Sequence, residues 1–151
     1  GLNYSILRPS ALYGTRDMIT RVLSQLVRAR FTSGTMRVQG PENKLDFSNV
    51  VDVANAFATC AVEPGAKNEI FNCTRGQGRP ILEAAEMIQA RIGGAIETLP
   101  HDEFYPNRDT LCSDKLQEYT KWRPTVDIEQ GIPAYLDWIL EQPYIKAMPK
   151  F

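Results

Sequence analysis

Arginines occur at several positions that the sequence pattern places in loops or at strand ends. Arg8 follows a short β-rich run, Arg75 and Arg79 flank two glycines, and Arg108 lies in a polar aromatic segment. A guanidinium group can donate two parallel hydrogen bonds to phosphate oxygens. Arginines of this kind more often lie on the surface or in ion pairs, however. The pattern suggests an anion site without fixing which arginines form it.

Two further stretches have alternative interpretations. The segment RGQGR at 75–79 resembles a phosphate cradle at a helix start, but its glycine spacing matches no known phosphate loop, which favours a plain strand-to-helix turn. Asp46 and Asp52 could form a carboxylate pair. Because they lie on either side of a strand-to-helix junction, we expect them to cap and orient the backbone rather than to transfer protons.

The sequence predicts no metal site. His101 is the only histidine, which excludes a site with two histidine ligands, and its polar surroundings favour a solvated side chain over a catalyst. The cysteines, Cys60, Cys73 and Cys112, are odd in number and widely spaced. This spacing fits neither a disulfide framework nor a zinc site, so we expect buried free thiols.

Length and composition predict one domain over residues 1–151, with a frayed tail at 141–151. The chain has 151 residues with 17 basic and 18 acidic side chains, and its net charge is -1. This balance gives no electrostatic basis for binding nucleic acid or an anionic membrane. No apolar run approaches the roughly 18 residues of a membrane span. We expect a cytoplasmic protein that contacts neither nucleic acid nor membrane.

Strand-like and helix-like patterns alternate, which predicts an α/β fold. Strands are expected at 4–8, 35–39, 44–48, 69–74 and 95–99, and helices from Thr15, at 50–61, 80–92, 113–119 and 128–140. The first helix should be capped by Thr15 or Asp17, with Met18 and Ile19 in its apolar stripe and Arg21 and Arg28 outside it. The strands at 35–39 and 44–48 could form a separate small ribbon. Pro133 should kink the last helix or mark its start near Ile132, despite the good cap at Asp127.

Four stretches in order resemble the C-terminal half of extended short-chain dehydrogenases, the NAD-dependent epimerase/dehydratase family. They are ILRPSALYG at 6–14, KLDFSNVVDVANAF at 44–57, EIFNCTRGQGRPILEAAEMI at 69–88 and SDKLQEYTKWRPTVDIEQGI at 113–132. The resemblance implies a Rossmann-type fold of short strands and helices that lacks the N-terminal dinucleotide-binding half. The glycine fingerprint and the catalytic Tyr-x-x-x-Lys pair of the family are not in this chain, so no catalytic residue is assigned.

The resemblance also implies roles for individual residues. Its cofactor-side positions are Pro9, Ser10 and Ala11, and its substrate-side positions are Arg8, Tyr13, Lys44 and Arg108. Leu45 stands where the family has an arginine that grips the nucleotide diphosphate, and Lys44 beside it would be an imperfect substitute. Ala11 stands where an asparagine is common, and Cys112 where the family has an acid.

The expected function is the substrate-side half of a nucleotide-sugar-modifying enzyme that uses NAD or NADP in its full-length form. Alone, the chain should be inactive and should not bind the cofactor tightly. The alternative is a free-standing binding or assembly module derived from that family. Either way the strand at 4–8 lacks a neighbour, so we expect a homodimer or docking of the missing N-terminal half. The residues do not choose among epimerase, dehydratase and reductase, or identify the sugar.

Overall fold

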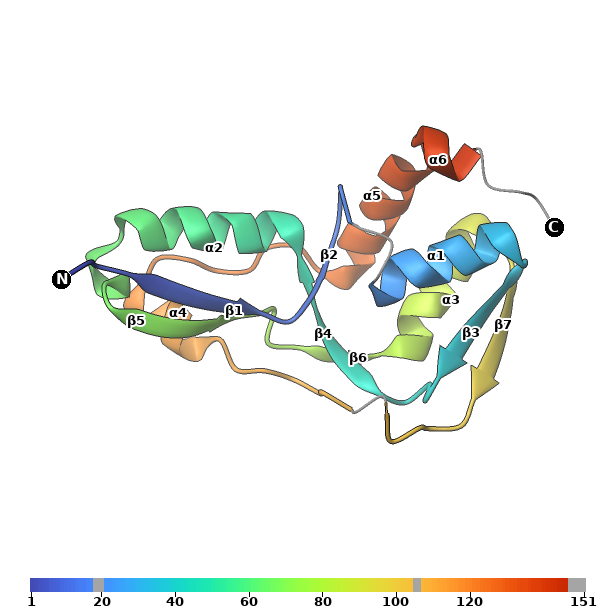
Figure 1. Cartoon of the computed structure of the whole chain (residues 1–151), viewed down its shortest axis with the longest axis horizontal. Coiled ribbons are helices and arrows are strands. Elements are labelled where there is room, and N and C mark those ends of the chain that lie inside the picture. Colours follow the sequence, from blue (N-terminus) through green and yellow to red (C-terminus); the bar gives the residue numbers. More distant parts are fainter. Residues whose placement is uncertain (18–20, 105–106, 147–151) are drawn as a thin grey trace.

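A computed structural model describes residues 1–17, 21–104 and 107–146 (Figure 1). Its strands are β1 (Ser5–Pro9), β2 (Ala11–Tyr13), β3 (Thr35–Gln39), β4 (Lys44–Asn49), β5 (Glu69–Cys73), β6 (Gly78–Pro80) and β7 (Ala95–Leu99). Its helices are α1 (Val22–Thr32), α2 (Val50–Val62), α3 (Ile81–Ile92), α4 (Asp114–Tyr119), α5 (Ile128–Leu140) and α6 (Pro143–Lys146), with a single 3₁₀ turn at Pro64–Ala66. The predicted α/β fold class is confirmed, with parallel strand pairs and helices.

The elements form two lobes that β4 connects (Figure 1). In one lobe β1 pairs in parallel with β5, and α2 and α4 pack nearby. In the other, β3 pairs in parallel with β7 beside α1 and α3. Between them β4 pairs in parallel with β2 and antiparallel with β6. The ribbon expected from 35–39 and 44–48 is therefore wrong, because β3 and β4 find their partners in different sheets.

Each lobe has its own hydrophobic core. Buried side chains from α1, α3, α5 and β3 fill the larger core, which includes Val27, Ile88 and Ile132, each 0% exposed. The smaller core lies under β1 and β5, where Phe71, Cys73 and Leu116 are buried. Helical spacing explains how α2 packs, because Val53, Ala56 and Cys60 recur on one face of the helix and lie in the smaller core. The two cores meet where β2 and β4 cross the molecule.

Most predicted elements are confirmed, but two helix starts differ from expectation. The α1 helix begins at Val22 after Arg21, so capping by Thr15 or Asp17 is wrong. Asp17 instead donates its N–H to the carbonyl of Gly14 in a turn, and Arg16 adopts a left-handed φ of 67°. Met18 and Ile19 lie outside the described residues. The α5 helix begins at Ile128 and continues through Pro133, so a start near Ile132 is also wrong.

Two buried carboxylates connect segments that are far apart in the sequence. Asp46 is 0% exposed, and it accepts hydrogen bonds from the backbone N–H groups of Arg75 at 3.0 Å, Gly76 at 2.9 Å and Leu111 at 3.4 Å. Asp52 accepts from the backbone N–H groups of Thr125 and Val126, each at 2.9 Å. The expectation that both residues orient backbone is confirmed.

At the start of α2, Asn49 caps the helix while Asp52 binds a distant part of the chain. Asn49 caps the helix by accepting from the Val51 N–H at 2.9 Å. Asp52 does not complete a capping box, because its carboxylate points to residues 125–126 instead. The Asp52 carbonyl also accepts from the indole N–H of Trp122 at 2.8 Å. One residue of α2 thus fixes the path of the chain between α4 and α5.

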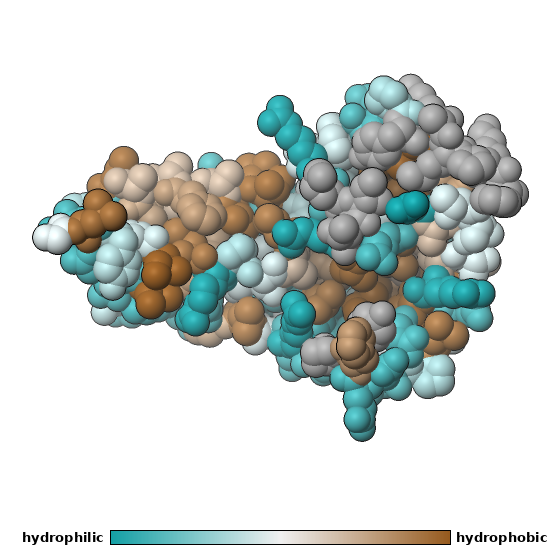
Figure 2. All heavy atoms as spheres, in the orientation of Figure 1, coloured by the Kyte–Doolittle hydropathy of each residue, from teal (hydrophilic) through white to brown (hydrophobic). Residues whose placement is uncertain are grey.

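The outer surface of the smaller lobe is apolar. Ile6 on β1 and Ile70 on β5 are partners in register, and they are 46% and 42% exposed. Val51, Phe57 and Val62 of α2 are also more than half exposed. Figure 2 shows hydrophobic side chains gathered over the part of the molecule that holds α2 and β1. Among the described strands, β1 pairs only with β5, which leaves its other edge open.

The C-terminal segment holds the short helix α6, and Ile145 within it is only 6% exposed. Residues 147–151 of the expected frayed tail lie outside the described residues, so that expectation stays a prediction. Within the described part of the chain, no helix is long and apolar enough to cross a bilayer.

Replacement of Asp46 tests the role of its carboxylate. Asp46→Asn leaves buried N–H groups of residues 75, 76 and 111 without a charged acceptor, so we expect the free energy of unfolding to fall by about 2 to 4 kcal/mol. The control Asp137→Asn removes only an exposed ion pair with Arg91 and should cost less than about 1 kcal/mol. Urea unfolding followed by circular dichroism measures both variants. Equal midpoints for the two variants would contradict this role.

Gly131 of α5 tests how closely this helix approaches β2. A Cβ at position 131 would lie 1.9 Å from the hydroxyl oxygen of Tyr13, so Gly131→Ala should destabilise the protein by about 1 to 3 kcal/mol despite the higher helix propensity of alanine. Tyr13→Phe removes that oxygen and should recover part of the loss in the double variant. Thermal unfolding of both single variants and the double variant measures the coupling. An additive double variant would show that the two groups do not meet.

Candidate functional site

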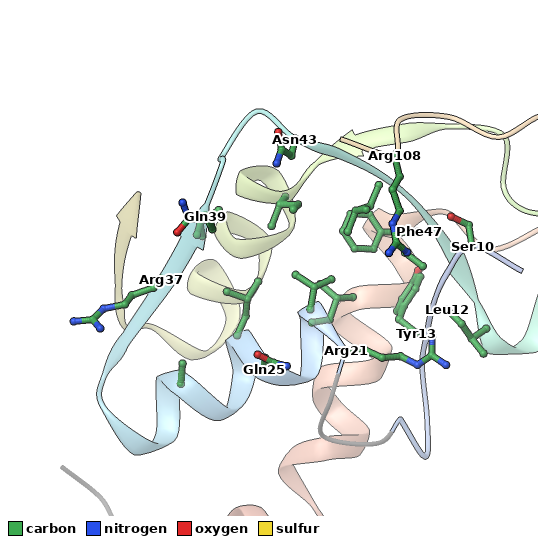
Figure 3. Close-up of a pocket in the computed structure, with 18 of the residues that line it drawn as sticks. Ser10, Leu12, Tyr13, Arg21, Gln25, Arg37, Gln39, Asn43, Phe47 and Arg108 are labelled. Carbon is green, nitrogen blue, oxygen red and sulfur yellow. The ribbon is translucent and has the colours of Figure 1, made fainter. Parts of the chain in front are cut away.

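A cavity of about 840 Å³ lies between α1, β2, β3 and β4 (Figure 3). Its walls carry apolar side chains from α1 and β4, among them Leu26, Leu45 and Phe47. Polar side chains reach it from several elements, including Gln25 of α1 and Gln39 of β3. An apolar cleft with a few polar groups of this size can hold a small organic ligand.

Four of the predicted site residues line this cavity. They are Ser10, Ala11, Tyr13 and Arg108. The first three follow one another around β2, where the Leu12 N–H donates to the Ser10 carbonyl at 2.7 Å. Because β2 pairs with β4, Ala11 and Tyr13 stand opposite Phe47 and Asn49. The tertiary structure therefore brings a segment near the N-terminus and the segment around Arg108 to one cavity.

The other predicted site residues lie elsewhere. Arg8 and Pro9 are exposed at the end of β1, and neither belongs to the cavity wall. Lys44 is also exposed and outside the wall, while its neighbour Leu45 lines the cavity. This alternation follows from strand geometry, since successive side chains of β4 point to opposite faces.

The backbone around Arg108 is held firmly against β4. The side-chain oxygen of Asn107 accepts from the N–H groups of Lys44 at 2.8 Å and Asp109 at 3.3 Å, and the Asp109 N–H donates to the Lys44 carbonyl at 3.0 Å. Within the described ranges, the Arg108 guanidinium forms no hydrogen bond or ion pair. The backbone of Arg108 is thus fixed beside β4, and its guanidinium remains available to an anionic ligand.

Tyr13 forms part of the wall with its ring rather than its hydroxyl. Its side chain is 2% exposed, and its ring meets Phe47 edge-on with centroids 6.3 Å apart. The hydroxyl points toward Gly131 of α5, inside the protein. Burial raises the pKa of Tyr13 above its ordinary value. The Tyr13 hydroxyl is therefore neutral at physiological pH and turned away from the cavity.

The RGQGR segment forms a turn whose backbone donors are bound by the carboxylate of Asp46. The N–H groups of Arg75 and Gly76 donate to the Asp46 carboxylate, and the Gly78 N–H donates to the Thr110 hydroxyl at 2.8 Å. These donors are not available to a phosphate, so the interpretation as a strand-to-helix turn is confirmed. The sequence did not predict that residues 78–80 form strand β6 within this segment.

The side chains of Arg75 and Arg79 form ion pairs with carboxylates of this chain. The Arg75 guanidinium donates to the Pro124 carbonyl at 2.9 Å and pairs with Asp127. Arg79 pairs with Glu83 and Glu129, and its hydrogen bonds to these two carboxylates raise its pKa above the ordinary value. Of the loop arginines that the sequence singled out, only Arg108 lines the cavity.

The thiols differ in exposure. Cys60 and Cys73 are buried as expected, and desolvation raises the pKa of Cys73 to about 12, which makes it a poor nucleophile. Cys112 is exposed, so the expectation of a buried thiol is wrong there, because the segment after Leu111 runs along the surface. Among the described residues, no three histidine, cysteine or acidic side chains come close enough to hold a metal ion.

The cavity also contains charged residues that the sequence did not single out as ligands. Arg21, Arg37 and Glu97 all line it. Arg37 and Glu97 are partners in register on β3 and β7, and they form an ion pair of 2.9 Å. The helical pattern placed Arg21 outside the apolar stripe of the first helix, but Arg21 is the N-cap residue directly before α1. Only tertiary packing shows that this residue lies at the cavity.

The chain is similar in sequence to curated epimerases. It is 29% identical over 147 residues to a protein from Methanocaldococcus jannaschii provisionally named UDP-glucose 4-epimerase, covering 92% of this chain and 46% of that protein. It is 30% identical over 148 residues to dTDP-L-rhamnose 4-epimerase from Burkholderia thailandensis, covering 91% and 40%. The chain thus spans less than half of the length of these relatives. No protein-family model matches it.

The same relationship is found among solved structures. The UDP-glucose 4-epimerase of Thermotoga maritima, solved with UDP-glucose, superposes with a TM-score of 0.80 at 25% identity, covering 93% of this chain and 47% of that one. The UDP-glucuronic acid 4-epimerase of Bacillus cereus, solved with UDP-glucuronic acid and NAD, gives a TM-score of 0.79 at 20% identity, covering 91% and 45%. Sequence and fold agree that the chain resembles the extended short-chain dehydrogenases of the NAD-dependent epimerase/dehydratase family, and it spans under half the length of the proteins it matches.

Proposed function

We propose that this chain supplies the substrate-side half of the active site of an NAD-dependent nucleotide-sugar epimerase or dehydratase. The observation that carries this proposal is the guanidinium of Arg108, which lines a cavity of about 840 Å³ and has no hydrogen bond or ion pair within the described residues. An apolar wall with amide side chains suits a nucleoside, and Arg108 suits a phosphate. The similarity to enzymes with UDP- and dTDP-sugars in their names supports the same class of ligand.

The described residues fit only part of a dinucleotide cofactor. Ser10 and Ala11 line the cavity near the exposed end of β1, where they can contact the nicotinamide side of NAD or NADP. The glycine-rich turn at 75–78 is unsuited to hold the pyrophosphate, because the N–H groups of Arg75, Gly76 and Gly78 donate to Asp46 and Thr110. Cofactor binding therefore needs a second half, and we expect this chain alone to bind NAD weakly.

The cavity residues also lack a group that could move a proton from a sugar. The Tyr13 hydroxyl faces Gly131, and Glu97, the one carboxylate among the described lining residues, is paired with Arg37. Bound NAD would accept and return a hydride, and this chain would orient the sugar nucleotide. We propose that the chain binds substrate and is catalytically inactive alone. Arg8 and Lys44 remain predicted contacts at the edge of that complex.

Calorimetric titration with UDP-glucose tests the proposal. The full chain should bind UDP-glucose, and Arg108→Gln should weaken binding by about tenfold or more, because a charge-assisted hydrogen bond is lost. The control Arg28→Gln alters an exposed arginine of α1 that does not line the cavity, and it should change affinity by less than about twofold. A parallel assay with NAD and UDP-glucose should show no epimerisation. Failure of the unaltered chain to bind UDP-glucose or UDP would refute the proposed function.

The apolar outer surface favours a second role as an assembly module. Exposed Ile6 and Ile70 lie beside the open edge of β1, and such an edge pairs readily with another strand. A homodimer through this edge, or docking of a dinucleotide-binding half, would cover it. Multi-angle light scattering should show a species larger than one chain, and Ile6→Lys should shift it toward a monomer. A monomer at every concentration would count against this role.

A further inference from the structure

Most of the positive charge that lines the cavity is already neutralised by this chain. The basic side chains among the described lining residues are Arg21, Arg37 and Arg108. Arg21 pairs with Asp17 at 3.7 Å, and Arg37 pairs with Glu97 at 2.9 Å. Arg108 has no hydrogen bond or ion pair within the described residues. One guanidinium therefore remains for a ligand to neutralise.

The part of β4 that lies beside Arg108 is apolar. Leu45 forms a parallel β-bridge with Asp109, the residue directly after Arg108, and Figure 3 shows Arg108 entering beside Phe47. Leu45 and Phe47 are two residues apart on one strand, so their side chains lie on the same face, and both line the cavity. Neither side chain carries a hydrogen-bond donor. A phosphate placed against them would lose its water without gaining a partner.

The other cations near position 45 do not compensate for this apolar wall. Lys44 is exposed and lies outside the cavity wall. Arg79 is the register partner of Leu45 on β6, but it pairs with Glu83 and Glu129. The cavity therefore offers one anchor for an anion, at Arg108, and an uncharged surface next to it.

We propose that Leu45 makes this cavity select a nucleotide with one phosphate, or a sugar linked to a nucleoside through one phosphate, over its diphosphate counterpart. The Arg108 guanidinium can hold one phosphate through two parallel hydrogen bonds. A second phosphate would lie against Leu45, where burial of an unpaired charge costs free energy. This proposal rests on the proposed function, because it specifies the number of phosphates in the nucleotide-sugar substrate.

Calorimetric titration with UMP and with UDP tests the selection. The unaltered chain should bind UMP about fivefold or more tightly than UDP, because the second phosphate of UDP loses water without gaining a donor. Leu45→Arg supplies a second guanidinium to the wall. This variant should bind UDP about tenfold more tightly than the unaltered chain does, with a change of less than about threefold for UMP.

Two control variants separate the position of the charge from its presence. Leu45→Met keeps an uncharged side chain of similar volume and should retain the preference for UMP. Thr98→Arg adds the same charge at an exposed position of β7 that does not line the cavity, and it should change both affinities by less than about twofold. Far-ultraviolet circular dichroism checks that each variant is folded. If Leu45→Arg does not fold, the ratio of the two affinities of the unaltered chain still decides the proposal.

The outcomes distinguish this proposal from the proposed function. If the unaltered chain binds UDP as tightly as UMP or more tightly, the selection of one phosphate is wrong while the proposed function stands. If Leu45→Arg tightens UMP and UDP by the same factor, the side chain at position 45 adds general attraction and does not set the number of phosphates, which also overturns the inference. If the unaltered chain binds neither nucleotide, both proposals are refuted.

Discussion

The buried carboxylate of Asp46 is the constraint on which the rest of the structure depends. It lies on β4, which runs between the two lobes, and it gathers the backbone of residues 75, 76 and 111 around one charge. A fully buried carboxylate is tolerated only when hydrogen bonds replace its water, and here backbone N–H groups do so. Because these donors come from two distant segments, the carboxylate also fixes where β6 and the Arg108 segment lie.

This arrangement decides which charged residues are left for a ligand. Asp46 and Asp52 are occupied by backbone donors, and Arg75 and Arg79 by carboxylates of α3, α5 and the turn before α5. Arg108 lies on the segment that β4 holds, but its own side chain stays unpaired within the described residues. The same network that stabilises the connection between the lobes therefore leaves the Arg108 guanidinium available at the cavity, where the one carboxylate among the described lining residues, Glu97, pairs with Arg37.

The cavity and the apolar outer surface have different physical origins. The cavity exists because β2 and β4 pair across the molecule and leave α1 to form a third wall. The outer surface is apolar because β1 and β5 form a sheet of only two strands, and α2 presents Val51, Phe57 and Val62 to solvent. A parallel sheet is ordinarily covered on both faces. The first feature suits a small anionic ligand, and the second suits another protein segment.

The sequence by itself determined the elements whose signals are local. Helix-like patterns along the chain located α2 and α3, and the motif order indicated the family resemblance. Tertiary structure alone decided that β3 and β4 lie in different sheets, that Arg21 rather than Lys44 lines the cavity, and that Arg75 forms an ion pair with Asp127. The physical reason is that patterns along a chain encode which face of an element is buried, whereas the partners of charges such as Arg37 and Arg75 lie on distant segments, whose approach depends on packing.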